Sequence, residues 1–437
     1  MTVVHAEVAY LFRHALLRDA AYELQLPADR ARLHALAFHL IEQAFGGRAP
    51  EPPPLDDINA PALEAHAIDA VAAELAMHAG LASSAGALET QRRDYLHRAA
   101  EHAQRRHQTT QALSLWSTLA DASQGIAKGE ALRRAAHVAY HSGMGRQAEA
   151  LLQQAVECLE QSGGRAHLAI ALNHLSIVTR ERGDIDKSEA MLMQSMAMMR
   201  ELKLDRYLPG ALVSLANLYR FTGRGHLSET TLREALDLLR NTDSRRLYGI
   251  ALGNLASTYI TSGRAEQAES LLHESYQVSL AAGNPGSAAI ALGNIALCHE
   301  TLAQWDKAEE TYHRTLKLAR EIGDRRTEGV NLGNMAQISL RAGRTGQALR
   351  LLEQAVAIHQ DCGNRRFEGI HLCDTALCHL RMQSTSQARA CWRKGITILR
   401  ELKDVHEITS FTEAMQSECK AAGVPPLDDG LGTEQPG

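Results

Sequence analysis

Glycine followed by asparagine recurs every forty residues, in a pattern that could hold an extended peptide. The dipeptides are Gly253-Asn254, Gly293-Asn294 and Gly333-Asn334, and Asp374 stands forty residues after the last asparagine. An asparagine side chain offers a donor and an acceptor, and a glycine lets a second backbone come close. The pattern predicts a peptide-binding row made of an asparagine column (Asn254, Asn294, Asn334 and Asp374) and a glycine column (Gly253, Gly293 and Gly333).

A second interpretation of the same residues is structural. Glycine inside a helix costs about 1 kcal/mol relative to alanine, so three copies need a compensating gain. Close stacking of neighbouring helices would supply it, and the asparagines would then bond to the next repeat instead of to a ligand. Both interpretations stay open on the sequence alone.

Residues of catalytic or metal-binding types lack the spacing that such chemistry needs. Cys373 and Cys378 are five residues apart, which turns them to different faces of one helix, and the chain has no Cys-x-x-Cys pair. A Gly-x-x-x-x-Gly-Lys-Ser/Thr phosphate loop is also missing from the sequence. We therefore expect no enzyme activity, no cofactor and no metal site.

Composition and charge argue against binding to nucleic acid or insertion in a membrane, and they favour a cytoplasmic location. The net charge is −5 with both signs mixed along the chain, so no basic surface for nucleic acid is expected. No apolar run approaches the roughly 18 residues that span a bilayer, so no membrane segment is expected. Seven cysteines without framework spacing are typical of reduced thiols and favour a cytoplasmic protein.

Three arginine pairs recur between the repeats described below. They are Arg245-Arg246, Arg325-Arg326 and Arg365-Arg366. Such pairs could line one rim for an acidic partner, or they could lie in solvated turns.

A forty-residue block occurs seven times between residues 131 and 410. One column is always leucine: Leu132, Leu172, Leu212, Leu252, Leu292, Leu332 and Leu372. Four residues later a small residue always follows: Ala136, Ser176, Ala216, Ala256, Ala296, Ala336 and Ala376. A fixed period of this length indicates stacked units, each too small to bury its apolar face alone.

Each unit is predicted to be two antiparallel helices. In the copy that starts at residue 251, Leu252, Leu255, Ala256 and Tyr259 lie on one helical face, and Gly263 ends that pattern. The second helix places Ala268 and Leu272 on its own face. The sequence therefore predicts an all-α solenoid of antiparallel helix pairs, in which the small residues let paired helices approach closely.

These residues carry a family resemblance. Leu252, Leu255, Ala256, Tyr259, Gly263, Ala268 and Leu272 have the spacing of the tetratricopeptide signature, and Trp305 and Tyr312 fill its aromatic columns in the next copy. The chain resembles the tetratricopeptide arrays of kinesin light chains, spindle adaptors and bacterial regulators, although its period is longer than the common one. The resemblance covers residues 131–410 and implies peptide binding in a concave groove. Its departures are Ala303 and Gln383 in place of the turn glycine, and no proline after the second helix.

The first 130 residues follow another pattern. Residues 1–45 are predicted to be a helical segment, 46–61 a proline-rich linker, and 62–130 divergent helical pairs with a leading repeat. In that leading repeat Ala112 and Trp116 match the later alanine and leucine columns. The order FRHALLRDAAYE, ELAMHA and YLHRAAEHA is similar to the segment that follows the nucleotide-binding domain of bacterial signal-transduction ATPases.

We expect residues 61 to about 420 to form one right-handed superhelix, with a capping helix at 411–423 and a disordered tail at 424–437.

Two functions fit this architecture. The first is a non-enzymatic scaffold or adaptor that binds a peptide or protein segment, in bacterial signalling or regulation. The second is a sensor or regulatory arm of a signal-transduction ATPase, lacking the nucleotide-binding domain. Its partner would be such an ATPase or another copy of the chain.

Overall fold

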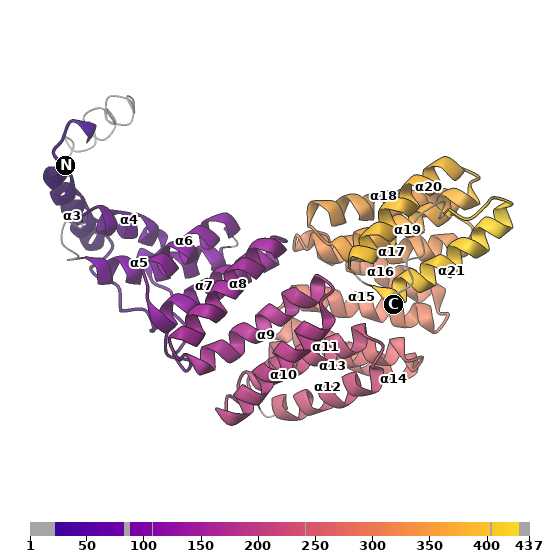
Figure 1. Ribbon diagram of the computed structural model, residues 1–437, viewed down its shortest axis with the longest axis horizontal. Coiled ribbons are helices and arrows are strands. Elements are labelled where there is room, and N and C mark those ends of the chain that lie inside the picture. Colours follow the sequence, from indigo (N-terminus) through magenta and orange to yellow (C-terminus); the bar gives the residue numbers. More distant parts are fainter. Residues whose placement is uncertain (1–21, 83–87, 107, 241, 403, 428–437) are drawn as a thin grey trace. The chain divides into compact units, whose positions relative to one another are not determined.

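The described part of the chain consists of helices joined by turns and loops. The computed structural model describes residues 22–82, 88–106, 108–240, 242–402 and 404–427, and every regular element in these ranges is a helix (Figure 1). The prediction of an all-α protein is confirmed. The chain groups into two compact units, residues 1–171 and 172–437, and their border falls within helix α9 (Arg165–Glu181).

The first unit contains the helices that precede the repeats and the first repeat itself. They are α3 (Pro27–Ala44), the 3₁₀-helix η1 (Ala67–Ala70), α4 (Ala72–Ala82), α5 (Glu89–Arg105), α6 (Thr109–Asp121), α7 (Gly125–His141) and α8 (Gly145–Gln161). Ala112 and Trp116 of α6 are fully buried, as expected for a leading repeat. Most of the FRHALLRDAAYE segment lies outside the described residues.

The proline-rich stretch at 46–61 joins α3 to η1 without a helix of its own and is packed against the helices of the first unit. Arg98 of α5 is buried, and its Nη2 donates to the Pro50 carbonyl at 2.7 Å. The same guanidinium forms a buried ion pair with Asp69 of η1, with 2.9 Å between Nη1 and Oδ1. One arginine thus holds the stretch through backbone contacts, which composition alone does not reveal.

The second unit continues as pairs of helices. Following α9 are α10 (Ile185–Glu201), α11 (Leu208–Phe221), α12 (Gly225–Leu239), α13 (Arg245–Thr261), α14 (Ala265–Ala281), α15 (Pro285–Thr301), α16 (Trp305–Glu321), α17 (Arg325–Arg341), α18 (Thr345–Asp361), α19 (Arg365–Arg381), α20 (Thr385–Glu401) and α21 (Val405–Ala422). Odd-numbered helices from α7 to α19 are the first helices of the seven predicted repeats, and even-numbered helices from α8 to α20 are the second helices.

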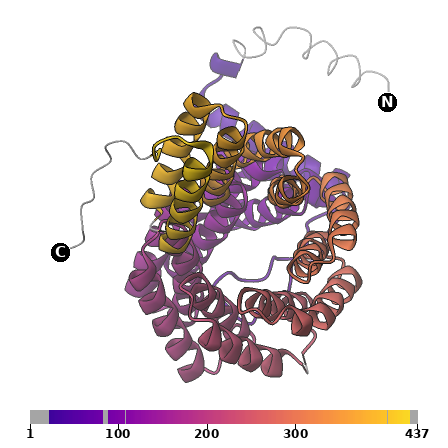
Figure 2. The same cartoon turned by 90° about the vertical axis from the view of Figure 1, so that its right-hand side faces the viewer.

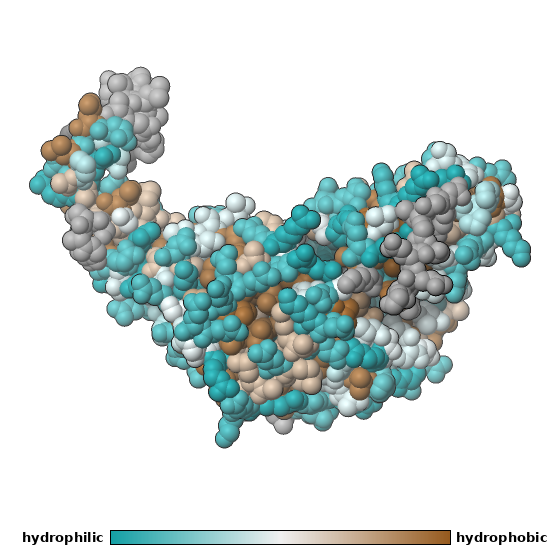
Figure 3. All heavy atoms as spheres, viewed as in Figure 1, coloured by the Kyte–Doolittle hydropathy of each residue, from teal (hydrophilic) through white to brown (hydrophobic). Residues whose placement is uncertain are grey.

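The predicted small and leucine columns form the core between these helices. Leu252, Ala256, Ala268 and Leu272 are each at most 3 % exposed, so the apolar faces of α13 and α14 are hidden by their neighbours. The face visible in Figure 3 is largely hydrophilic with smaller apolar patches, as this burial requires. No helix within the described residues is both long and apolar enough to cross a bilayer.

The turn inside each hairpin needs a left-handed residue. Gly263 has φ +73°, and Ala303 and Gln383 adopt φ +57° and +58° at the equivalent positions. Helices commonly end on such a residue, usually glycine because it has no Cβ. Ala303 and Gln383 therefore adopt the same left-handed backbone conformation as the turn glycine, at the steric cost of a Cβ atom in that conformation.

Asn284, Asp324 and Asn364 precede three of the first helices, and two of these three side chains cap the helix that follows. The Asp324 and Asn284 side chains accept hydrogen bonds from the backbone N–H groups of Thr327 and Ser287, at 3.0 and 3.3 Å. Asn364 does not cap its helix, because its side chain bonds to His359 instead.

The last helix, α21, packs at the end of the core and begins before residue 411, where the capping helix was expected to start. Met415 and Cys419 of α21 are buried against the Trp392 cluster of α20. The chain continues in packed form beyond this helix: Leu427 is fully buried in the same cluster, and its N–H lies 3.4 Å from Met415 Sδ. The predicted disordered tail is therefore wrong for residues 424–427, while residues 428–437 lie outside the described part.

The second unit bends back on itself. Its helices follow a curved path (Figure 2), and residues far apart in sequence meet there. A Cβ on Gly183, in the α9–α10 turn, would lie 2.6 Å from the carbonyl oxygen of Leu402. The Arg366 guanidinium of α19 lies 5.6 Å from the centre of the Phe221 ring at the end of α11.

Candidate functional site

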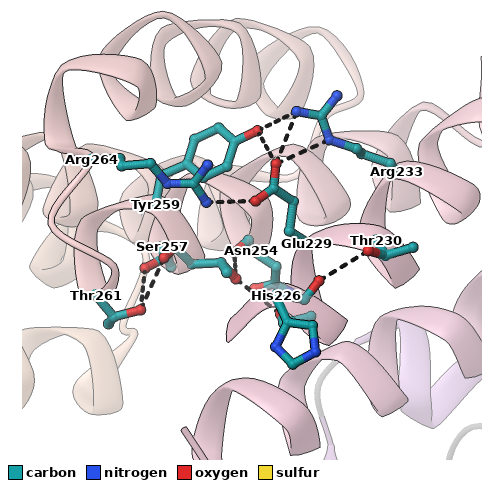
Figure 4. A network of polar contacts seen from close by, with 11 residues as sticks. His226, Glu229, Thr230, Arg233, Asn254, Ser257, Tyr259, Thr261 and Arg264 are labelled. Atoms are coloured by element: carbon teal, nitrogen blue, oxygen red, sulfur yellow. Dashed lines mark hydrogen bonds and ion pairs between the residues drawn. The ribbon is translucent and has the colours of Figure 1, made fainter. Parts of the chain in front are cut away.

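Each first helix is buried over most of its surface and leaves a narrow strip partly exposed. In α13, Leu255 and Ala256 are buried, whereas Asn254 and Ser257 are partly exposed. These two residues are three positions apart and share one helix face, along which Thr261 also lies (Figure 4). We define the first-helix strip as the equivalent partly exposed residues of α9 to α17: His174, Ile177, Ser214, Asn217, Asn254, Ser257, Asn294, Leu297, Asn334 and Gln337.

Three members of the asparagine column bond to the neighbouring repeat. Asn294 Nδ2 donates to Ser257 Oγ at 3.2 Å, and Gln337 Nε2 donates to Asp374 Oδ1 at 2.8 Å. Asn334 hydrogen-bonds to the Tyr312 hydroxyl in the preceding hairpin. At these positions the structural interpretation of the column is supported, since the polar groups link successive units.

Asn254 differs from the other members. Its side chain is partly exposed, and within the described residues its carboxamide makes no hydrogen bond; only its backbone carbonyl accepts one, from Thr258. Because a carboxamide carries two donors and an acceptor, Asn254 keeps its bonding capacity for a ligand.

The glycine column makes room for the next first helix. A Cβ on Gly293 would lie 2.9 Å from Asn331 Oδ1, and a Cβ on Gly333 would lie 2.1 Å from His371 Nε2. At Gly253 the nearest atom would be Ser275 Oγ at 3.2 Å. Close packing of the helices at these glycines offsets their low helix propensity, as the structural interpretation requires.

Asp374 is the one buried member of the asparagine column. Burial raises the pKa of its carboxyl group to about 7. The hydrogen bond from Gln337 acts in the opposite direction and lowers this pKa, whereas the negative charge of Glu407 raises it further. The carboxyl group therefore changes charge near neutral pH.

A second set of contacts links the repeats through their second helices, and sequence reasoning missed it. Arg264, which precedes α14, bonds to Glu229 of α12 with 2.5 Å between Nη2 and Oε2, and its guanidinium lies 4.3 Å from the centre of the Tyr259 ring (Figure 4). The hydrogen bond from Arg264 is the largest influence that lowers the pKa of Glu229. Equivalent pairs join Arg224 to Glu189 at 2.7 Å and Arg344 to Glu309 at 3.3 Å. We call these three pairs the arginine–glutamate ladder.

The arginine pairs at the repeat junctions begin first helices, and two of the three pairs are engaged in contacts. Arg326 Nη2 lies 3.4 Å from Asn364 Oδ1, and Arg366 Nε lies 2.7 Å from Asp404 Oδ2. Arg365 bonds to Glu401 at 2.9 Å. These pairs therefore lie in the first turns of helices, where Arg325, Arg326 and Arg365 are exposed to solvent. Acidic partners offset the unfavourable position of a cation at a helix N-terminus.

The remaining candidates lie in the core. His371, Cys373 and Cys378 of α19 are all buried. Burial raises the pKa of the Cys378 thiol to about 12, which keeps it in the unreactive protonated form.

Similar solved structures share this fold at low sequence identity. A Rap protein complexed with competence and sporulation factor gives a TM-score of 0.54 at 14% identity and covers 69% of this chain and 84% of that one. The Rap conjugation gene regulator of plasmid pLS20, in complex with the Phr* peptide, gives 0.53 at 11%, covering 65% and 76%. A signal transduction ATPase with a tetratricopeptide repeat sensor, from Pyrococcus horikoshii, gives 0.49 at 12%, covering 79% and 55%.

No curated protein matches the sequence. The tetratricopeptide repeat model, in contrast, matches residues 128–201, 207–281 and 287–361. These ranges contain the helix pairs α7 to α18, with the leucine, small and turn-glycine columns described above. The chain therefore belongs to the tetratricopeptide repeat family.

Proposed function

We propose that this protein is a non-enzymatic scaffold that binds a peptide or protein segment along the first-helix strip. The observation that carries the proposal is Asn254, a partly exposed carboxamide that makes no hydrogen bond within the described residues while its column neighbours are engaged. An extended peptide presents backbone donors and acceptors that such a carboxamide can satisfy.

The neighbouring positions suit the same ligand. Asn217, Ser257 and Gln337 are polar, whereas Ile177 and Leu297 at equivalent places are apolar, so the strip offers both hydrogen-bonding and apolar contacts along the repeats. The recorded complex of a plasmid Rap regulator with a peptide adds support by likeness of fold. We propose a cytoplasmic location, which the seven free cysteines suit, and a role in signalling or regulation, by likeness of fold to the Rap proteins.

Selection from a random peptide display library tests this function. Binding of the selected peptides is then measured by fluorescence anisotropy on the wild type, on Asn254→Ala and on Gln277→Ala. Gln277 is an exposed amide on α14, the second helix of the same hairpin, and so is a matched control. We expect Asn254→Ala to weaken binding about 10-fold, as for one lost hydrogen bond near 1.4 kcal/mol, and Gln277→Ala to bind as the wild type. Failure to select any peptide, or equal loss in both variants, would reject the proposal.

A regulatory arm for a signal-transduction ATPase is the second candidate. It is supported by the resemblance of ELAMHA and YLHRAAEHA, which lie in the adjacent helices α4 and α5. Co-elution of the protein with an ATPase encoded beside it, and a change in that enzyme's ATP turnover, is the expected result. Independent elution and unchanged turnover would exclude this candidate.

A further inference from the structure

Three arginines from distant repeats gather where the second unit bends back. Arg180 and Arg220 occupy equivalent positions in the last turns of α9 and α11. Arg366 reaches them from the start of α19, since its guanidinium lies 5.6 Å from the ring centre of Phe221, the residue after Arg220. These three residues form the arginine cluster.

The cluster carries more positive charge than its neighbours neutralise. Arg366 is paired with Asp404 at 2.7 Å and with Glu407 at 2.9 Å. Arg220 Nε, in contrast, is buried without a hydrogen-bond partner. Within the described residues, the side chains of Arg180 and Arg220 form no ion pair or hydrogen bond.

Electrostatics support the same conclusion. Burial is the largest influence on Arg220 and lowers the pKa of its guanidinium to about 10, with repulsion from Arg180 and then Arg366 acting in the same direction. A buried cation without a counter-ion is costly. An anion placed among the three guanidiniums would relieve that cost.

We propose that Arg180, Arg220 and Arg366 bind a carboxylate group of the peptide that lies on the first-helix strip. The inference rests on the proposed function. A guanidinium can hold a carboxylate through two parallel N–H donors. The carboxylate belongs to the peptide because the cluster continues the strip: Asn217 and Arg220 are three residues apart on α11 and therefore neighbours on its surface.

The test compares library selections on the wild type, Arg220→Gln and Arg240→Gln. Arg240 is an exposed residue of the same repeat, paired only loosely with Asp237 at 3.7 Å, and is the matched control. Peptides selected by the wild type should be enriched in aspartate, glutamate or a required free C-terminus. Their amidated or Glu→Gln versions, and binding to Arg220→Gln, should be weaker by roughly 10- to 100-fold, with Arg220→Lys partly restoring affinity. Inorganic phosphate at matched ionic strength should compete poorly.

Melting temperature separates a binding role from a structural one. Since the buried Nε of Arg220 has no hydrogen-bond partner, Arg220→Gln should melt at or above the wild-type temperature, and a clear fall would overturn the proposal. Selected peptides without acidic enrichment would overturn the carboxylate site and leave the scaffold function intact. Strong competition by phosphate, with no preference for peptide carboxylates, would also overturn it.

Discussion

At the scale of single residues, the repeat imposes a left-handed backbone conformation on its turn even where the residue there has a Cβ atom that disfavours it. Ala303 keeps φ +57° in a turn that uses glycine elsewhere. A non-glycine residue in this region costs about 1 to 2 kcal/mol, whereas glycine loses about 0.4 to 1 kcal/mol through greater freedom of the unfolded chain. The balance favours glycine.

Ala303→Gly should therefore stabilise the α15–α16 hairpin by about 0.5 to 1 kcal/mol. Ala342→Gly is the matched control, because Ala342 ends α17 with φ −78° and gains nothing from glycine. Hydrogen exchange of the amides in α15 and α16 measures the difference. Slower exchange in Ala303→Gly and unchanged or faster exchange in Ala342→Gly is expected; faster exchange in both would contradict the account.

The buried carboxyl group of Asp374 should make stability depend on pH. Its pKa is raised from an ordinary 3.8 to about 7, so the folded state holds the proton more tightly than the unfolded state does. The free energy of unfolding therefore falls as pH rises through the window between these values.

Asp374→Asn removes this titration and keeps an oxygen to accept from Gln337. Relative to the wild type, its free energy of unfolding should rise by about 4 kcal/mol between pH 4 and pH 8. Urea unfolding of both proteins across this range provides the measurement. A stability difference that does not change with pH would show that Asp374 titrates normally.

At the scale of helices, the sequence predicts a large part of the structure. The repeat period places the leucine and small columns in the core, because burial follows helical periodicity, and Gly263 and Ala303 mark the turns. The arginine–glutamate ladder was not predictable in the same way: Glu229 and Arg264 belong to successive hairpins, so their pairing depends on how the hairpins stack. The same holds for Asn254 and Asn294, which have one sequence pattern and different bonding.

The glycine column gives a graded test of helix packing. Gly333→Ala would place its Cβ 2.1 Å from the ring of His371, which is buried beside His359, and should cost about 1 to 3 kcal/mol. Gly253→Ala meets only Ser275 Oγ at 3.2 Å and gains up to about 1 kcal/mol of helix propensity, so it should be neutral or slightly stabilising. Thermal unfolding compares them; equal effects would argue against packing as the reason for this column.

At the scale of the whole molecule, stability should be distributed along the array. Each hairpin contacts mainly its neighbours, so damage stays local. Long-range contacts such as Arg366 with Phe221 could not be predicted, because they depend on the accumulated curvature of many repeats.

Ala268→Leu tests this distribution. Ala268 is fully buried between helices, and a leucine there should cost about 1 to 3 kcal/mol. Hydrogen exchange should accelerate first in α13 to α16. Uniform acceleration from α9 to α20 would instead indicate that the second unit unfolds as one block.

The central claim is that a peptide lies on the first-helix strip. Its most direct test is photo-crosslinking of a library-selected peptide that carries benzoylphenylalanine, with the crosslinked residues identified by mass spectrometry. We predict crosslinks to strip residues of α11 to α17, such as Asn217 and Ser257. Crosslinks confined to exposed residues of the second helices, such as Gln277, would contradict the account.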